Sequence, residues 1–252
     1  MKIAHAIRDF FMPPKCAGCY AVFRVKYGEK NELCSECAKK WTLLKAEICE
    51  VCGKPYFDCR CSTKRLEKAG VSTLIKLVPY KHKSATSNNV ILFIKRNRDK
   101  RTFAFLADEI SYELEKYCDK LGLRKKDAVI TFSPRRKKTV NEVGFDQAKL
   151  LSKMISKRVG IKFLPTLKRK YSGGSAQKML DSSKRKENTK GAFALKNGIK
   201  LEKRTVLLFD DLVTTGSTMA ECAKILKKNG AALIVGICVA YTERDAKLSS
   251  LD

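Results

Sequence analysis

The sequence predicts an α/β protein whose mostly parallel sheet has helices on both faces, preceded by a small cysteine-rich module. After about residue 65, short and continuously apolar segments alternate with helical ones, which is typical of parallel strands covered on both faces. Paired cysteines are concentrated before that point, and 252 residues are enough for both parts. We therefore expect an N-terminal helix and zinc-binding module at 1–64 and an α/β domain at 65–252.

The predicted elements follow one another in regular order. Strands are expected at 70–80, 127–134, 204–211 and 231–241, where apolar residues run without interruption. Helices are expected at 88–99, 101–122, 145–160 and 217–230, with Gly160 and Gly230 at two of the ends. The polar stretch 165–191 has no clear periodicity, so we expect a lid or linker that hinges at Gly173 and Gly174.

The cysteines near the N-terminus occur in close pairs. The pairs are Cys16/Cys19, Cys34/Cys37, Cys49/Cys52 and Cys59/Cys61. Two-residue spacing lets both thiolates bind one metal, and four thiolates complete a tetrahedral site, so we predict two structural zinc ions. We expect sequential pairing of the cysteines; interleaved pairing, disulfides and an iron–sulfur cluster are the alternatives. Apolar residues at positions 3, 7, 10 and 11 predict a helix before the first pair.

The chain is strongly basic. It contains 53 Lys and Arg against 26 Asp and Glu, a formal net charge of +27, and such a field attracts polyanions. Basic clusters with aromatic residues beside them are typical of proteins that bind single-stranded nucleic acid, although core packing is expected for most of these rings. We predict nucleic-acid contacts at Lys95, Arg96, Arg98, Lys100, Arg101, Lys168, Arg169, Lys170, Lys184 and Arg185. A merely solubilising basic surface is the alternative.

The segment VLLFDDLVTTGSTM at 206–219 combines two carboxylates with a hydroxyl-rich turn. A glycine in the turn permits positive φ, so backbone N–H groups and the next helix N-terminus can converge on a phosphate. The carboxylates Asp210 and Asp211 would repel that phosphate and instead suit sugar hydroxyls or a divalent cation. Together these groups predict a site for a ribose 5-phosphate. An ordinary strand-to-helix turn capped by Asp is the alternative.

This segment resembles the phosphoribosyl-pyrophosphate motif of type I phosphoribosyltransferases, and nearly the whole chain resembles the ComF family of competence proteins. The resemblance also rests on SPRRKKTVNEVGFDQAKLL at 133–151 and on the paired cysteines. A further match in spacing comprises Gln177, Leu180, Arg185, Asn188, Gly191, Ala192 and Phe193. Ser133 and Asp146 depart from the family pattern, which often has His and usually has Asn at these places.

The resemblance implies a type I phosphoribosyltransferase-like fold and assigns the site residues. Asp210 and Asp211 would bind the ribose hydroxyls, and Arg135 and Arg136 would face the pyrophosphate. The 5-phosphate would be held by Thr214, Thr215, Gly216, Ser217 and Thr218. Mg²⁺ would bridge the pyrophosphate and the ribose. The stretch 165–191 would be a mobile loop that closes over the site.

The resemblance also implies a role in DNA uptake during natural transformation. The protein would bind single-stranded DNA and phosphoribosyl pyrophosphate and assist DNA transport across the inner membrane, with a membrane channel or a helicase as partner. An active phosphoribosyltransferase with an unknown acceptor and a structural zinc-bearing adaptor are the alternatives. No base-binding hood is recognisable and no catalytic residue is assigned.

The location expected from the sequence is the cytoplasm. No apolar run reaches the ~20 residues of a membrane span, and Asp9 interrupts the first apolar segment, so we expect no signal peptide. A peripheral position at the inner membrane is compatible with these features.

Overall fold

The computed structural model describes residues 13–22, 32–81, 85–170 and 191–242. Within these ranges, a five-stranded sheet has the order β1-β7-β6-β2-β3, and every neighbouring pair is parallel. Its strands are β1 (Val71–Pro79), β2 (Ala128–Phe132), β3 (Lys162–Phe163), β6 (Thr205–Val213) and β7 (Leu233–Tyr241). A separate antiparallel pair is formed by β4 (Leu167–Arg169) and β5 (Phe193–Leu195). The predicted parallel sheet is confirmed.

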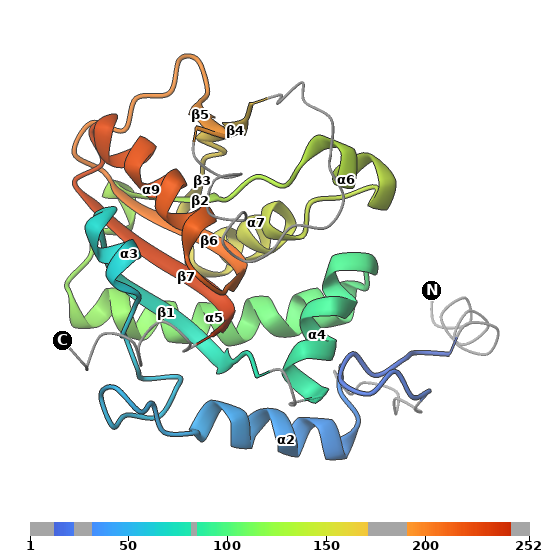
Figure 1. Cartoon of the computed structure of the whole chain (residues 1–252). Helices are drawn as coiled ribbons and strands as arrows, with labels where there is room; N and C mark the ends of the chain where they lie inside the picture. Colours follow the sequence, from blue (N-terminus) through green and yellow to red (C-terminus); the bar gives the residue numbers. More distant parts are fainter. Residues whose placement is uncertain (1–12, 23–31, 82–84, 171–190, 243–252) are drawn as a thin grey trace.

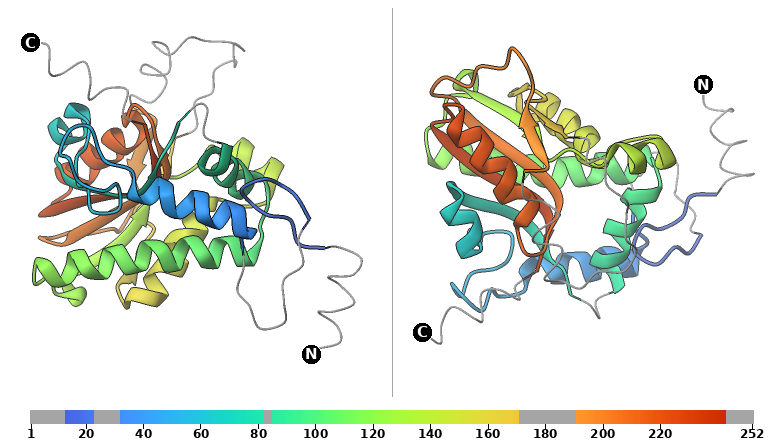
Figure 2. Two further views of the ribbon diagram at one scale, coloured as in Figure 1. Left: turned by 90° about the horizontal axis from the view of Figure 1, so that it is seen from below. Right: turned by 45° about the horizontal axis from the view of Figure 1, so that its top comes forward.

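Helices cover both faces of the sheet (Figures 1 and 2). One face carries α2 (Ser35–Ala46), α4 (Ala85–Arg96), α5 (Lys100–Lys120) and α7 (Gln147–Val159), whose apolar residues share one core with alternate residues of the strands. The other face carries α3 (Lys64–Lys68), α9 (Ser217–Lys228) and the β4–β5 pair, with a second core. Because strands are buried on both sides, they have continuous apolar runs.

Several details differ from the sequence-based expectation. Strand β6 continues beyond the acidic pair to Val213, and α9 ends at Lys228 rather than Gly230. A short helix, α6 (Lys137–Val143), was not predicted because none of its residues is buried, which leaves no apolar periodicity to detect. The predicted helix before Cys16 and the glycine hinge of the 165–191 stretch lie outside the described residues.

The cysteine-rich segment packs directly on the α/β part. Trp41 and Leu44 of α2 belong to the same hydrophobic core as α5 and the sheet. Trp41 Nε1 donates to Glu109 Oε2 at 3.2 Å, and Lys45 Nζ lies 2.6 Å from the same oxygen. The domain boundary at 64/65 stays a prediction from the sequence. In the described ranges, no helix combines the length and the apolar character needed to cross a bilayer.

The connections of the sheet reverse direction between β6 and β2. Helix α7 leads from β2 outward to β3 on one face, whereas α9 leads from β6 outward to β7 on the other. Phe132 pairs with Phe209, and Ser133 N donates to Phe209 O at 2.9 Å, so β2 ends beside the residue that precedes the acidic pair of β6. In open α/β sheets, ligands bind beyond the carboxyl ends of the strands at such a reversal.

Candidate phosphoribosyl and zinc sites

A pocket of about 320 Å³ opens at this reversal point. It is lined by Arg136, Arg169, Asp210, Leu212, Val213, Thr214, Thr215, Gly216, Ser217, Thr218 and Met219. Its volume is at the lower end of the range found for small-molecule sites. The fold thus brings the acidic strand end, the hydroxyl-rich turn and two arginines from other segments to one cavity.

The turn between β6 and α9 has the geometry of an anion site. Gly216 is the N-cap residue of α9 at φ 71°, and no side chain accepts a hydrogen bond at this cap. The first N–H groups of a helix have no partner within the helix, so they are available to a ligand. Thr215 Oγ1 and Ser217 Oγ lie 2.8 Å apart on the same side of the turn. This arrangement suits the oxygens of a phosphate.

The two carboxylates of the motif have different surroundings. Asp210 lines the pocket, whereas Asp211 is buried and does not. Successive residues of a strand point to opposite faces, and Asp211 accordingly faces α4. Burial and the charge of Asp211 raise the pKa of the Asp210 carboxyl well above its ordinary value, and Lys95 opposes this shift. The structure therefore brings one of the two acidic residues to the ligand pocket.

Lys95 of α4 is the counterion of this acidic pair. Its Nζ lies 3.2 Å from Asp211 Oδ2, and the two side chains are 29% and 6% exposed. The basic cluster 95–101 led us to expect nucleic-acid contact at this residue, but the structure places its ammonium group beneath the pocket. Lys95 balances one of two adjacent negative charges in a poorly solvated position.

The two arginines predicted to face the pyrophosphate also differ in their position relative to the pocket. Arg136 lines the pocket, whereas Arg135 does not. The Arg135 guanidinium donates to Lys95 O at 3.2 Å and to Gln147 Oε1 at 2.8 Å, and its backbone N donates to Asp146 Oδ2 at 3.0 Å. Arg135 thus connects the turn that follows β2 to the ends of α4 and α7. Asp146 is held by this contact and by its cap on α7, so its carboxylate is not directed at an anion in the pocket.

Arg169 reaches the pocket from β4. Its guanidinium lies 4.8 Å from the centre of the Phe193 ring on β5. Burial and the nearby charge of Arg136 lower the pKa of Arg169. Two guanidinium groups held close together at a cavity favour a multiply charged anion. The sequence indicated only a basic cluster at 168–170; the pairing of β4 with β5 gives Arg169 its direction.

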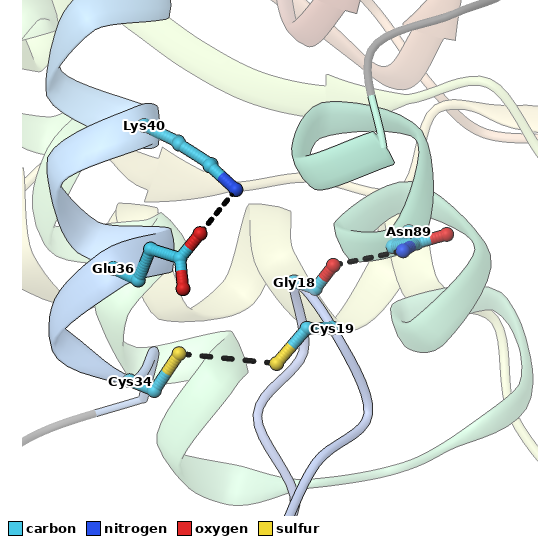
Figure 3. Close-up of polar contacts among 6 residues, drawn as sticks. All are labelled: Gly18, Cys19, Cys34, Glu36, Lys40 and Asn89. Atoms are coloured by element: carbon cyan, nitrogen blue, oxygen red, sulfur yellow. Dashed lines mark hydrogen bonds and ion pairs between the residues drawn. The ribbon is translucent and has the colours of Figure 1, made fainter.

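The N-terminal cysteines form two separate groups. Their sulfur atoms lie within 4.8 Å of one another in each group, and the groups comprise Cys16, Cys19, Cys34 and Cys37, and then Cys49, Cys52, Cys59 and Cys61. Cys19 Sγ and Cys34 Sγ are 3.8 Å apart (Figure 3), close to the ~3.8 Å spacing of thiolates on a tetrahedral zinc ion. Each group offers four thiolates, so both fit structural zinc in the sequential arrangement.

The first cysteine group is joined to α4. Asn89 Nδ2 donates to Gly18 O at 2.8 Å, as Figure 3 shows, and Tyr20 OH donates to Asn89 O at 3.1 Å. Lys95 lies further along the same helix. The metal-binding turn therefore helps to fix the helix that supplies the counterion of Asp211.

Comparison with known proteins identifies two domains in the chain. Residues 147–251 match the phosphoribosyl transferase domain, and residues 7–69 match the double zinc ribbon domain. The chain is 27% identical to DNA utilization protein YhgH of Shigella flexneri over 215 residues, and this aligned region covers 83% of this chain and 90% of that protein. It is also 27% identical over 207 residues to competence protein ComFC of Streptococcus pneumoniae, covering 79% and 83% of the two chains. The chain therefore combines a double zinc ribbon with a phosphoribosyl transferase domain, and over most of its length it is similar to proteins named for DNA utilization and competence.

Solved phosphoribosyltransferases resemble this chain more distantly. Adenine phosphoribosyltransferase from Saccharomyces cerevisiae is 18% identical with a TM-score of 0.38, covering 62% of this chain and 77% of the enzyme. The parallel sheet, the domain match and the motif at 206–219 establish the type I phosphoribosyltransferase fold. The double zinc ribbon accounts for the two cysteine groups as structural zinc sites.

The predicted nucleic-acid residues differ in exposure. The exposed ones are Arg96, Arg98, Lys100, Lys168 and Lys170. Arg101 is half-buried and lies 3.7 Å from Asp99 Oδ1. Lys184 and Arg185 lie outside the described residues. Phe93, Phe103 and Phe132 are buried, so these rings serve the core and are not available for base stacking.

Replacing Lys95 with Met should destabilise the protein by about 2 kcal/mol near pH 8, because it leaves the Asp211 carboxylate buried without a counterion. The loss should shrink at about pH 5, since the raised pKa of Asp210 lets the pair lose charge by protonation. Urea unfolding at both pH values measures the effect. Arg98→Met, at an exposed position of the following turn, is the control and should change stability by less than about 0.5 kcal/mol. A loss that does not depend on pH would contradict this explanation.

Proposed function

We propose that this chain is a ComF-type competence protein that binds single-stranded DNA and phosphoribosyl pyrophosphate and assists DNA uptake across the inner membrane. The observation that carries the proposal is the convergence of Arg136, Arg169 and Asp210 on the hydroxyl-rich turn in one pocket. The names of the relatives, a DNA utilization protein and a competence protein, support the DNA-handling part. An inner-membrane DNA channel or a helicase is the proposed partner, met at the cytoplasmic face of the membrane.

Each part of the ligand has a corresponding group in the pocket. The turn 214–218 would hold the 5-phosphate through N–H groups and hydroxyls, and Asp210 would accept hydrogen bonds from the ribose hydroxyls. Arg136 and Arg169 would contact the pyrophosphate. Asp211 would act indirectly, because its N–H donates to Asp210 Oδ1 at 3.0 Å and so orients that carboxylate. Mg²⁺ would neutralise the pyrophosphate charge beside Asp210.

The DNA would follow exposed basic residues around the mouth of this pocket. The α4–α5 turn supplies Arg96, Arg98 and Lys100, and β4 and the residue after it supply Lys168 and Lys170. The bond from Arg135 to Lys95 O holds the end of α4 beside the turn that carries Arg136. Phosphate contacts of this kind give affinity without sequence preference, as an uptake protein requires.

Removing three positive charges from the α4–α5 turn should weaken this binding selectively. The triple variant Arg96→Ala, Arg98→Ala, Lys100→Ala should bind oligo-dT at least about 10-fold more weakly at low salt. The slope of log affinity against log salt should fall by about 2, since each single-strand phosphate contact contributes about 0.7. Fluorescence anisotropy across a salt series measures both quantities.

A control variant with the same change in charge distinguishes direct contact with the DNA from the effect of the protein's net positive charge. Arg124, Lys125 and Lys126 are exposed and directly precede β2, so they lie at the amino end of this strand, away from the pocket at the carboxyl ends. Their triple Ala variant should retain most of the affinity and nearly the same salt slope. Equal losses in the two triple variants, or binding that salt does not affect, would contradict the proposed DNA path.

A further inference from the structure

Helix α3 lies against the phosphate-binding turn. A Cβ added to Gly216 would come within 3.0 Å of Leu66 Cγ and 3.1 Å of Thr63 Oγ1. Leu66 is fully buried in the core that α3 shares with α9. The backbone of the turn at Gly216 therefore lies so close to Thr63 and Leu66 that only glycine fits there. A side chain of α3 that faces this turn lies at the edge of the pocket.

Arg65 is that side chain. Its Nη1 donates a hydrogen bond to Ser217 Oγ, which lies 2.8 Å from Thr215 Oγ1. Both hydroxyls line the pocket. Arg65 is half-buried, and no carboxylate of the described residues forms an ion pair with it. A partly desolvated guanidinium beside two hydroxyls and a helix N-terminus is unfavourable unless an anion is bound there.

The second zinc site determines where Arg65 lies. Cys61 ends the second cysteine group, and Thr63 begins α3 by accepting a hydrogen bond from Leu66 N at 3.2 Å. Cys61 O accepts a hydrogen bond from the buried Lys76 Nζ at 2.6 Å, which attaches this segment to β1. The path from the metal-binding cysteines to Arg65 is therefore short and fixed at both ends.

We propose that Arg65 is a ligand-binding residue of the pocket and donates to the terminal 5-phosphate of a phosphoribosyl ligand. The proposal rests on the proposed function of the pocket and adds to it a cation supplied by the end of the zinc-binding segment. On binding, the guanidinium transfers its hydrogen bond from Ser217 Oγ to a phosphate oxygen, and the hydroxyl turns to donate to the same phosphate. Arg136 and Arg169 remain at the pyrophosphate end.

Isothermal titration calorimetry with three probes separates the two ends of the ligand. The probes are phosphoribosyl pyrophosphate with Mg²⁺, ribose 5-phosphate, and pyrophosphate with Mg²⁺. Arg65→Ala should weaken the first two by about 10- to 100-fold, as expected for loss of a charged hydrogen bond, and change pyrophosphate affinity by less than about 2-fold. Arg65→Lys should give an intermediate loss because it keeps the charge without the planar fork. Lys68→Ala, exposed on the same helix, should match the wild type.

The zinc content and melting temperature of each variant show whether a loss of affinity is local. The proposal is wrong if Arg65→Ala binds ribose 5-phosphate as tightly as the wild type does. It is also wrong if a variant that keeps both zinc ions loses as much affinity for pyrophosphate as for ribose 5-phosphate. If Arg65→Ala loses zinc, the affinities of Arg65→Lys for ribose 5-phosphate and pyrophosphate test the proposal instead. Wild-type protein that binds none of the probes overturns the proposed function and this inference together, whereas wild-type binding with unaffected variants overturns this inference alone.

Discussion

Cys37→Ser is expected to abolish cooperative folding of the chain and to leave one bound zinc ion instead of two. A structural zinc ion contributes on the order of 10 kcal/mol to folding in small zinc-binding peptides, and a whole domain is stable by only about 5–15 kcal/mol. Cys37 is 4% exposed and lies in the same hydrophobic core as α5 and the central strands. Loss of this metal site would therefore remove support from the main core as well as from the cysteine-rich segment.

Metal analysis and circular dichroism melting of the purified protein test this expectation. The control is Cys118→Ala, because Cys118 is buried in the same core but belongs to neither cysteine group. It should retain two zinc ions and lose about 1–2 kcal/mol of stability through the lost packing. Two zinc ions per chain in Cys37→Ser, or a melting curve like that of the control, would contradict a folding role for the first site.

Each of the two zinc sites lies next to a helix that carries a basic side chain. The metal-binding turn contacts α4 through Asn89, and α4 ends near Lys95 and Arg96. The second site leads into α3 and Arg65. Each zinc site therefore lies next to a helix whose basic side chain contacts β6 or the turn that follows it: Lys95 contacts Asp211, and Arg65 contacts Ser217. If Arg65 binds the ligand as proposed, the zinc ribbon segment would supply part of the site and would not be a separate attachment domain.

Much of the fold could be predicted because its signals are local. The apolar runs of β1, β2, β6 and β7 and the helical periodicity of α5, α7 and α9 depend only on burial of each element. The paired cysteines and the turn at 214–218 carry their chemistry within a few residues. Each of these features could be recognised without knowing which segment lies beside it.

The contacts that individual charged side chains make could not be predicted from local sequence signals. Lys95 and Arg169 stand in basic clusters that look alike in sequence, yet the former pairs with Asp211 and the latter lines the pocket. Arg65 lies on a five-residue helix with no periodicity, and its role depends on contact with a turn 152 residues away. Strand alternation alone would have separated Asp210 from Asp211, and that signal was present in the sequence.

Asp210→Asn is expected to lower the affinity for phosphoribosyl pyrophosphate by about 100-fold or more while making the free protein more stable. The ligand loses charged hydrogen bonds to its ribose hydroxyls, each contributing about 1.5–3 kcal/mol. The protein loses a carboxylate that burial and Asp211 disfavour in its ionised form. Functional residues held in unfavourable surroundings often show this opposition between stability and binding.

The pH dependence of the stability gain identifies its cause. Because the folded-state pKa of Asp210 is raised, the native protein binds this proton more tightly than the unfolded chain does, so stability falls as pH rises through the interval between the two pKa values. Asn does not titrate. The advantage of Asp210→Asn should therefore be small near the ordinary pKa of about 4, grow with pH, and become constant above the raised value.

Asp211→Asn is the matched comparison, because it changes the neighbouring carboxylate in the same way. It removes the partner of Lys95 on the opposite face of β6, so it should destabilise the protein and reduce ligand affinity by less than about 10-fold. Thermal melting from about pH 5 to pH 8 and calorimetry with the Mg²⁺-bound ligand measure both effects. If the two variants lost affinity equally, both carboxylates would contact the ribose; if Asp210→Asn bound normally, the acidic pair would serve the fold and the pocket would recognise its ligand through phosphate contacts alone.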